Sequence, residues 1–181
     1  MENVVALFVP CFMDQLQPQV AVDTLQVLRR IGVQVQFPED QTCCGQPAFN
    51  SGHWQEARPL AERFIRIFSR FETVVCPSGS CAAMVRSFYP QLLEGSSLRS
   101  EVEALGKRVF EFSEYLVKVR GITDVGAEFP HRVTYHDSCH LLRELNLRDE
   151  PRSLLRQVKG LELVEMTRSD ECCGFGGTFS V

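Results

Sequence analysis

The sequence carries an internal duplication that its cysteines mark. A single cysteine and a later Cys-Cys-Gly occur twice, and both occurrences keep nearly the same spacing. The offsets between corresponding cysteines are 139 − 11 = 128, 172 − 43 = 129 and 173 − 44 = 129 residues. A repeat of this length predicts two structural units rather than a solenoid. Because thiol side chains keep their place in both units, the repeat also indicates a metal or redox site.

Short apolar runs lead into both sets of cysteines, and such runs are typical of buried strands. Segments with apolar residues at helical spacing separate these runs. The alternation predicts an α/β fold with two duplicated Rossmann-like parallel-sheet units. Cysteines that follow parallel strands would meet at the carboxyl end of one sheet. The expected strands are 4–9, 33–37, 73–75, 132–136 and 161–164, and the expected helices are 18–31, 53–71, 81–89 and 152–158.

We expect a first unit over residues 1–90, a helical connector over residues 91–130 and a second unit over residues 131–181. Within the connector, residues 109–119 place apolar side chains on one helical face. At the same offset, the counterpart of Cys81 would fall at 81 + 128 = 209, past the last residue of the sequence. We therefore interpret the second unit as incomplete and truncated at its C-terminus, because an α/β unit that stops here lacks its closing strand and helix.

Composition excludes several classes of protein. A net charge of −4 and a pI near 5.6 give no electrostatic basis for binding nucleic acid or an anionic membrane. No apolar run is long enough for a transmembrane segment, and the N-terminus lacks the pattern of a signal peptide. We expect a cytoplasmic protein that reaches a membrane only through partner proteins. In that compartment, cysteines are better candidates for metal or redox chemistry than for disulfides.

The adjacent cysteines, Cys43 and Cys44, indicate a polynuclear cluster rather than a single ion. Neighbouring residues send their side chains in divergent directions, which suits a tetrahedral zinc site poorly. Adjacent thiolates could reach two irons of one iron–sulfur cluster. The glycine after each pair allows the backbone to approach such a cluster closely, and its amide could donate a hydrogen bond to sulfur.

On these motifs the chain resembles the cysteine-rich CCG-domain family, and the resemblance covers essentially the whole sequence. The family includes the B subunit of heterodisulfide reductase and the iron–sulfur subunits of glycolate oxidase and anaerobic glycerol-3-phosphate dehydrogenase. Its pattern is a cysteine, a Cys-Cys-Gly and a closing cysteine motif. The segments 77–81, 136–140 and 172–179 are similar to the lactate-utilization branch of the family.

The resemblance implies an iron–sulfur redox subunit of a complex that oxidises L-lactate, a 2-hydroxy acid, to pyruvate. Such a subunit would hold [4Fe-4S] clusters of the non-cubane kind found in the family and would not be active alone. The implied partners are a ferredoxin-type iron–sulfur protein and a further small subunit. The expected ligands are Cys11, Cys43, Cys44, Cys76, Cys81, Cys139, Cys172 and Cys173, with His136 and His140 as hydrogen-bond donors or proton carriers beside them.

The sequence departs from the family pattern at the closing motif of the first unit. Heterodisulfide reductase has Cys-x-x-Cys there, whereas this chain has Ser78 in place of the first cysteine and Cys76 two residues earlier. Two interpretations of Cys76 stay open, a fifth ligand or a small buried side chain. We also expect Asp137 to cap the following helix, and His53 and His131 to lie at the surface.

Three other functions are compatible with the residues. The cysteines could hold structural zinc in a scaffold protein, and zinc could also replace iron in protein handled in air, although the usual Cys-x-x-Cys pairs are missing. A thiol–disulfide enzyme could use the vicinal thiols, provided that one is exposed and has a low pKa. Within the family, the complex could oxidise glycolate or glycerol 3-phosphate instead of lactate.

Overall fold

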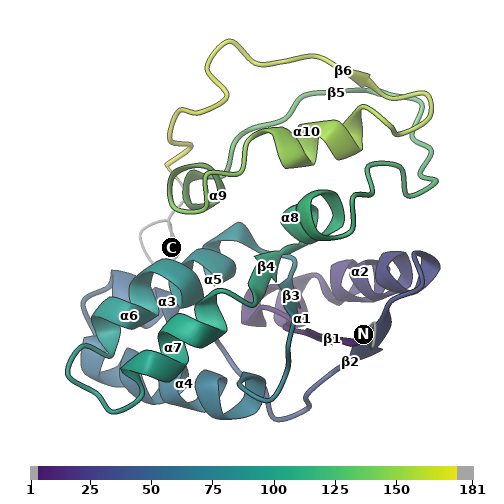
Figure 1. Ribbon diagram of the computed structural model, residues 1–181. Coiled ribbons are helices and arrows are strands. Elements are labelled where there is room, and N and C mark those ends of the chain that lie inside the picture. Colours follow the sequence, from purple (N-terminus) through teal and green to yellow (C-terminus); the bar gives the residue numbers. More distant parts are fainter. Residues whose placement is uncertain (1–3, 175–181) are drawn as a thin grey trace.

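A four-stranded parallel sheet forms the centre of the computed structural model, which describes residues 4–174. The strand order is β2-β1-β3-β4, and every neighbouring pair runs in the same direction (Figure 1). This arrangement confirms the predicted α/β fold. The strands are β1 (Val4–Leu7), β2 (Gln34–Gln36), β3 (Val74–Cys76) and β4 (Val109–Glu111).

Helices account for most of the remaining secondary structure. None of those within residues 4–174 is long and apolar enough to cross a membrane. In chain order they are α1 (Cys11–Leu16), α2 (Pro18–Arg30), α3 (Gln46–Asn50), α4 (Trp54–Phe68), α5 (Gly79–Ala83), the π-helix η1 (Met84–Phe88), α6 (Tyr89–Leu92), α7 (Arg99–Gly106), α8 (Phe112–Glu114), the π-helix η2 (Tyr115–Val119), α9 (Cys139–Arg143) and α10 (Asp149–Leu155).

Apolar side chains cover both faces of the sheet, because successive residues of a strand point to opposite sides. Leu7 lies in one buried cluster with Leu28 of α2. Phe8, the next residue, lies in the other cluster, where the ring of Phe64 from α4 meets it edge-on at 4.9 Å. The helix after β1 and the helices after β2 therefore pack on opposite faces, as in a doubly wound sheet.

Residues 109–119 differ from the predicted helix. Their first three residues form β4, which pairs with β3 in the register Val74↔Val109 and extends the sheet. Only then does the chain turn into α8 and η2. Buried and half-buried residues alternate in β4, a period of two that is too short to detect beside the helical spacing that follows. The segment between the two cysteine-rich units is thus not entirely helical.

The second half of the chain repeats the start of the first. Its strands β5 (Arg132–Val133) and β6 (Glu162–Leu163) are parallel, with α9 and α10 between them. Val4 pairs with Gln34 in the first sheet, and Arg132 pairs with Glu162 in the second. Each residue of the second pair follows its counterpart in the first pair by the same number of residues, since 4 + 128 = 132 and 34 + 128 = 162. The sequence duplication is therefore also a duplication of strand register.

The two halves meet where α9 packs against α5 (Figure 1). Leu141 of α9 lies in the same buried cluster as Phe8 and Phe64 of the first half. A Cβ atom placed on Gly79 of α5 would lie only 2.8 Å from the Cβ of Leu141. Glycine at this position therefore allows the two helices to approach each other closely.

Gly79→Ala is expected to lower the free energy of unfolding by about 1–3 kcal/mol, because the new methyl group overlaps Leu141. Urea denaturation of the full chain measures the change. Gly106→Ala is the matched control, since the nearest atom to its added Cβ is Arg86 Cα at 3.6 Å. Alanine there should be neutral or slightly stabilising, as expected in a helix. Equal stability of the two variants would contradict a close contact at Gly79.

Candidate functional site

Five cysteines lie at the carboxyl edge of the four-stranded sheet. Cys11 begins α1 just after β1, and Cys76 ends the neighbouring strand β3. Cys43 and Cys44 lie in the loop after β2, and Cys81 lies in α5. Strands β1 and β3 are adjacent, and the helices that follow them pack on opposite faces, which is where open α/β sheets place their sites. The predicted gathering of the first-unit cysteines at this edge is thus found in the structure.

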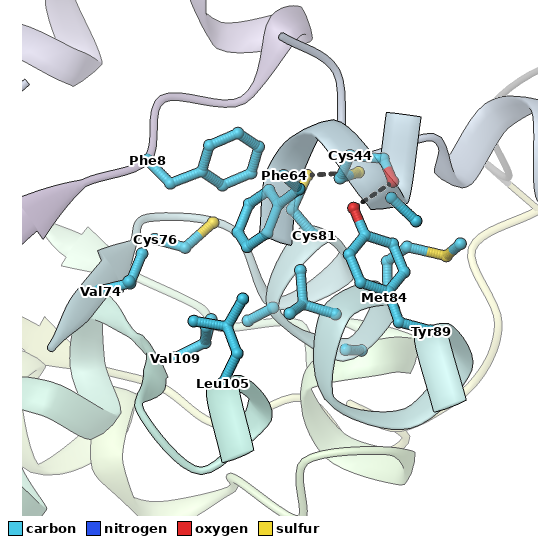
Figure 2. Packing of buried hydrophobic residues seen from close by; sticks show 14 of the residues in the cluster. Phe8, Cys44, Phe64, Val74, Cys76, Cys81, Met84, Tyr89, Leu105 and Val109 are labelled. Atoms are coloured by element: carbon cyan, nitrogen blue, oxygen red, sulfur yellow. Dashed lines mark hydrogen bonds between the residues drawn. The ribbon is translucent and has the colours of Figure 1, made fainter. Parts of the chain in front are cut away.

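The adjacent cysteines point their sulfur atoms to different partners. Cys43 Sγ lies 3.3 Å from Cys11 Sγ, and Cys44 Sγ lies 3.4 Å from Cys81 Sγ. Figure 2 shows the second contact inside the buried cluster, together with the side chain of Cys76. The two neighbouring sulfurs thus have different partners, although they also lie close enough to shift each other's pKa. One pair faces the half-exposed side of the site, and the other lies in the core.

Contacts between the sulfurs shift the pKa values of the five cysteines in opposite directions. The hydrogen bond from Cys11, followed by the nearby Cys44, lowers the pKa of Cys43 to about 3. The hydrogen bond from Cys44, followed by the nearby Cys76, holds the pKa of Cys81 well below its usual value. The other three cysteines have raised pKa values, Cys11 and Cys44 mainly through their contact with Cys43 and Cys76 mainly through burial.

Ser78 stands where heterodisulfide reductase has the first cysteine of its closing motif. Its hydroxyl accepts a hydrogen bond from the Cys81 backbone N–H at 3.4 Å and so caps α5. Cys76 is fully buried, and its thiol donates to the backbone carbonyl of Ser78 at 3.6 Å. Its sulfur also lies close enough to Cys81 for each to shift the pKa of the other. Both interpretations of Cys76 share this buried position, and ligation by its sulfur stays a prediction.

The two Cys-Cys-Gly motifs adopt the same local conformation. Gly45 has φ = 84° and Gly174 has φ = 80°, values that side chains rarely tolerate. Each glycine donates its backbone N–H to the sulfur of the first cysteine of its motif. The distances are 3.4 Å from Gly45 N to Cys43 Sγ and 3.4 Å from Gly174 N to Cys172 Sγ. The positive φ therefore favours glycine at both turns, and at Gly45 an added Cβ would also lie 3.3 Å from the carbonyl oxygen of Ala57.

The cysteines of the second unit form a more open group. Cys139 begins α9 and is half-buried, whereas Cys172 and Cys173 are exposed. Burial and the nearby Cys172 both raise the pKa of the Cys139 thiol. In the first unit the corresponding Cys44 is covered by Cys81, and among residues 4–174 no segment covers Cys173 in this way. The remainder of the second motif, residues 175–179, lies outside the described residues.

The histidines beside Cys139 have different surroundings. His136 Nε2 lies 2.7 Å from the backbone carbonyl of Glu171, so this nitrogen carries the proton and donates it. His140 Nε2 lies 3.5 Å from the side-chain nitrogen of Gln46, the residue after the first Cys-Cys-Gly. The other ring nitrogen of His140 is buried without a hydrogen-bond partner in the described part of the chain. The two remaining histidines are exposed, as predicted: His53 and His131.

Sequence reasoning missed Tyr89. This side chain is fully buried, and its hydroxyl donates to the backbone carbonyl of Cys44 at 2.8 Å (Figure 2). Burial, and then the nearby cysteines with Cys44 first, raise the pKa of its hydroxyl. No spacing marks this tyrosine in the sequence, where it precedes Pro90 at the expected end of a helix.

Comparison with known proteins identifies the family. The sequence pattern of the cysteine-rich domain, CCG, matches residues 5–86 and 133–181. The chain is 48% identical over 178 residues to lactate utilization protein A of Bacillus pumilus, covering 98% of this chain and 74% of that protein. Proteins of the same name from Geobacillus kaustophilus and Oceanobacillus iheyensis are 47% and 44% identical, with 74% and 72% of their lengths covered.

The chain belongs to the CCG cysteine-rich domain family. The two matched segments contain the two Cys-Cys-Gly turns, and the unmatched residues 87–132 include β4. Within residues 4–174 of this CCG chain, no group of three or more His, Cys, Asp and Glu side chains is arranged to hold a single metal ion.

A buried ion pair organises the second CCG segment. The guanidinium of Arg152 on α10 donates two hydrogen bonds to the carboxylate of Asp137, at 2.6 and 2.8 Å. Ser169 donates to the same carboxylate at 2.7 Å, and Glu165 accepts from Arg152 at 2.9 Å. The predicted capping of α9 by Asp137 is therefore wrong, because its carboxylate is held by Arg152 and Ser169. Through Ser169, the network around Asp137 joins the loop before Cys139 to the loop before the second Cys-Cys-Gly.

Arg152→Met is expected to lower the free energy of unfolding by about 3–5 kcal/mol, because it leaves the Asp137 carboxylate buried and uncompensated. Chemical denaturation gives the value. Arg132→Met serves as the control, since the 3.3 Å pair of Arg132 with Glu162 is exposed and should contribute at most about 1 kcal/mol. A loss of similar size in both variants would show that the buried pair does not organise the second segment.

Cys43 is expected to react with iodoacetamide at a nearly constant rate between about pH 5 and pH 8 in reduced, metal-free protein, because its thiol is already ionised. An ordinary thiol slows about tenfold for each pH unit below its pKa. Mass spectrometry of the labelled fragment gives the rate. Cys11→Ala removes the main donor to Cys43 and should restore a pH dependence. A tenfold decrease per pH unit in the parent chain would disprove the low pKa.

Proposed function

We propose that this CCG chain is an iron–sulfur redox subunit that acts in the oxidation of L-lactate to pyruvate. The observation that carries the proposal is the continuous set of five sulfur atoms at the carboxyl edge of the sheet, between β1 and β3. The names of the relatives support the choice of lactate as substrate. The cytoplasm remains the expected location.

The donor atoms of the first site fit an iron–sulfur cluster. Cysteine thiolates are the usual ligands of such clusters, and neighbouring sulfurs lower the pKa values of Cys43 and Cys81. We assign Cys11, Cys43, Cys44 and Cys81 as ligands, with Cys76 as the fifth. The Gly45 amide, which already donates to Cys43, would help to tune the potential. A [4Fe-4S] cluster bound there, of the non-cubane kind, would supply electron transfer.

The second site would bind a cluster more weakly. We assign Cys139, Cys172 and Cys173 to it, and two of these three cysteines are exposed. His136 holds the backbone just before Cys172 and would fix the second turn. His140 would offer its buried, unpartnered ring nitrogen to a neighbouring group. Both histidines therefore serve the site through hydrogen bonds in this proposal.

The chain would work as one member of a complex. We propose a ferredoxin-type iron–sulfur protein and a further small subunit as its partners, and we expect no lactate oxidation by this chain alone. Its own residues would hold the clusters, keep water away from Cys44, Cys76 and Cys81, and expose Cys11 and Cys43 on the side where an electron partner could approach. Glycolate and glycerol 3-phosphate stay as alternative substrates of such a complex.

One observation favours a second function, that of a thiol–disulfide enzyme. Cys43 combines a pKa of about 3 with partial exposure, and Cys11 Sγ lies 3.3 Å away, where it could form a disulfide with it. This function would use two of the five cysteines and would leave the buried pair, Cys44 and Cys81, without a role. An iron–sulfur site uses all of them.

Iron, acid-labile sulfide and zinc contents of anaerobically purified protein test the proposal. We expect sulfide near the iron content and an EPR signal that changes with reduction. Zinc without sulfide would support a structural zinc site, whereas protein free of metal with a reversible disulfide would support the thiol–disulfide enzyme. Cys43→Ser and Cys44→Ser should each remove the first cluster, and His53→Ala should leave it intact. Cys76→Ser decides whether the fifth sulfur is a ligand.

A further inference from the structure

The peptide of Cys44 needs support that the cysteine side chains do not provide. The sulfurs of Cys43 and Cys44 contact different partners, Cys11 and Cys81, so a small rotation of the backbone between them would disturb both contacts. The backbone carbonyl of Cys44 is turned into the core, where it accepts from the hydroxyl of Tyr89 at 2.8 Å. A buried carbonyl without a donor is unfavourable, so this hydrogen bond favours one orientation of the peptide.

Tyr89 has little freedom to move away from this position. Its side chain is fully buried, and Phe64 packs against its ring edge-on, with 5.7 Å between ring centroids. Figure 2 shows the hydroxyl directed at the Cys44 carbonyl. Because the ring is fixed by packing, the hydroxyl acts as a rigid donor.

The π-helix η1 places Tyr89 and Cys81 on the same side of one continuous helical segment. Eight residues of regular α-helix would turn Tyr89 about 80° away from Cys81, since each residue turns the chain by about 100°. Residues 84–88 adopt the wider π turn, which takes back much of that angle. Both residues therefore reach Cys44, Cys81 through its sulfur and Tyr89 through its hydroxyl. Such π turns frequently occur at functional sites.

We propose that Tyr89 is a positioning residue of the first site, whose hydroxyl holds the Cys44 peptide so that the Cys44 sulfur stays directed at Cys81. Its purpose, a preformed set of ligands, rests on the proposed iron–sulfur function. The contact between the hydroxyl and the Cys44 carbonyl can be tested separately in metal-free protein.

Tyr89→Phe tests this role, because it removes the hydroxyl and keeps the ring. In the reduced, metal-free full chain, alkylation of Cys44 should become roughly tenfold faster relative to that of Cys76. Both thiols are buried, and global unfolding exposes them equally, so their ratio reports local opening alone. Tyr115→Phe is the matched control, a tyrosine buried in the other apolar cluster, and should leave the ratio unchanged.

An unchanged ratio in Tyr89→Phe would overturn the proposal, because the hydroxyl would then have no effect on Cys44. Equal acceleration of both thiols, or failure of the variant to fold, would also overturn it, because the hydroxyl would then stabilise the whole core. In protein with its cluster, Tyr89→Phe should also shift the EPR spectrum or the midpoint potential, and Tyr115→Phe should not. Selective opening of Cys44 in a chain that binds no iron would support the positioning role and remove the proposed cofactor.

Discussion

The contact between Cys44 and Cys81 is the interaction on which the rest of the first site depends. It joins a loop that follows β2 to a helix that follows β3, and the contacts of Gln46 with Ser80 and of Tyr89 with Cys44 support it. Burial makes an isolated thiolate unfavourable, yet the hydrogen bond from Cys44 and the nearby Cys76 lower the pKa of Cys81. The pKa values of these cysteines therefore depend on one another. Removal of one sulfur changes the ionisation of its neighbours as well as the number of ligands.

The same sequence pattern produces two sites of different character. Both Cys-Cys-Gly turns have the same glycine conformation and the same N–H to sulfur contact, so the local chain does not explain the difference. The difference comes from what lies over the second cysteine of each pair. Cys44 is covered by Cys81 and Tyr89, whereas Cys173 is exposed. In the second unit, the ion pair of Asp137 and Arg152 holds the loops around the cysteines in place, and this pair is buried although the cysteines are not.

The sequence allowed the fold class and the meeting of the first-unit cysteines to be predicted, because both follow from local patterns. Apolar runs mark strands, and residues that follow parallel strands share one edge. The register duplication also follows from the constant cysteine offset. β4 was not predicted, because three alternating residues are too few to show a period beside the helix that follows. The roles of Tyr89 and Arg152 were not predicted, because they come from contacts between segments that are distant in sequence. Tyr89 and Cys44, for example, are 45 residues apart.

The junction of the two halves fixes the two sites relative to each other. α5 carries Cys81, α9 begins with Cys139, and the absence of a side chain at Gly79 allows the helices to touch. Beside this contact, Gln46 donates to the carbonyl of Ser80 at 3.3 Å and faces His140. A core cluster that includes residues of both halves resists hinge motion between them. Under the proposed function this rigidity has a direct use. Electron transfer weakens steeply with distance, so two redox groups in one chain need a separation that thermal motion does not change.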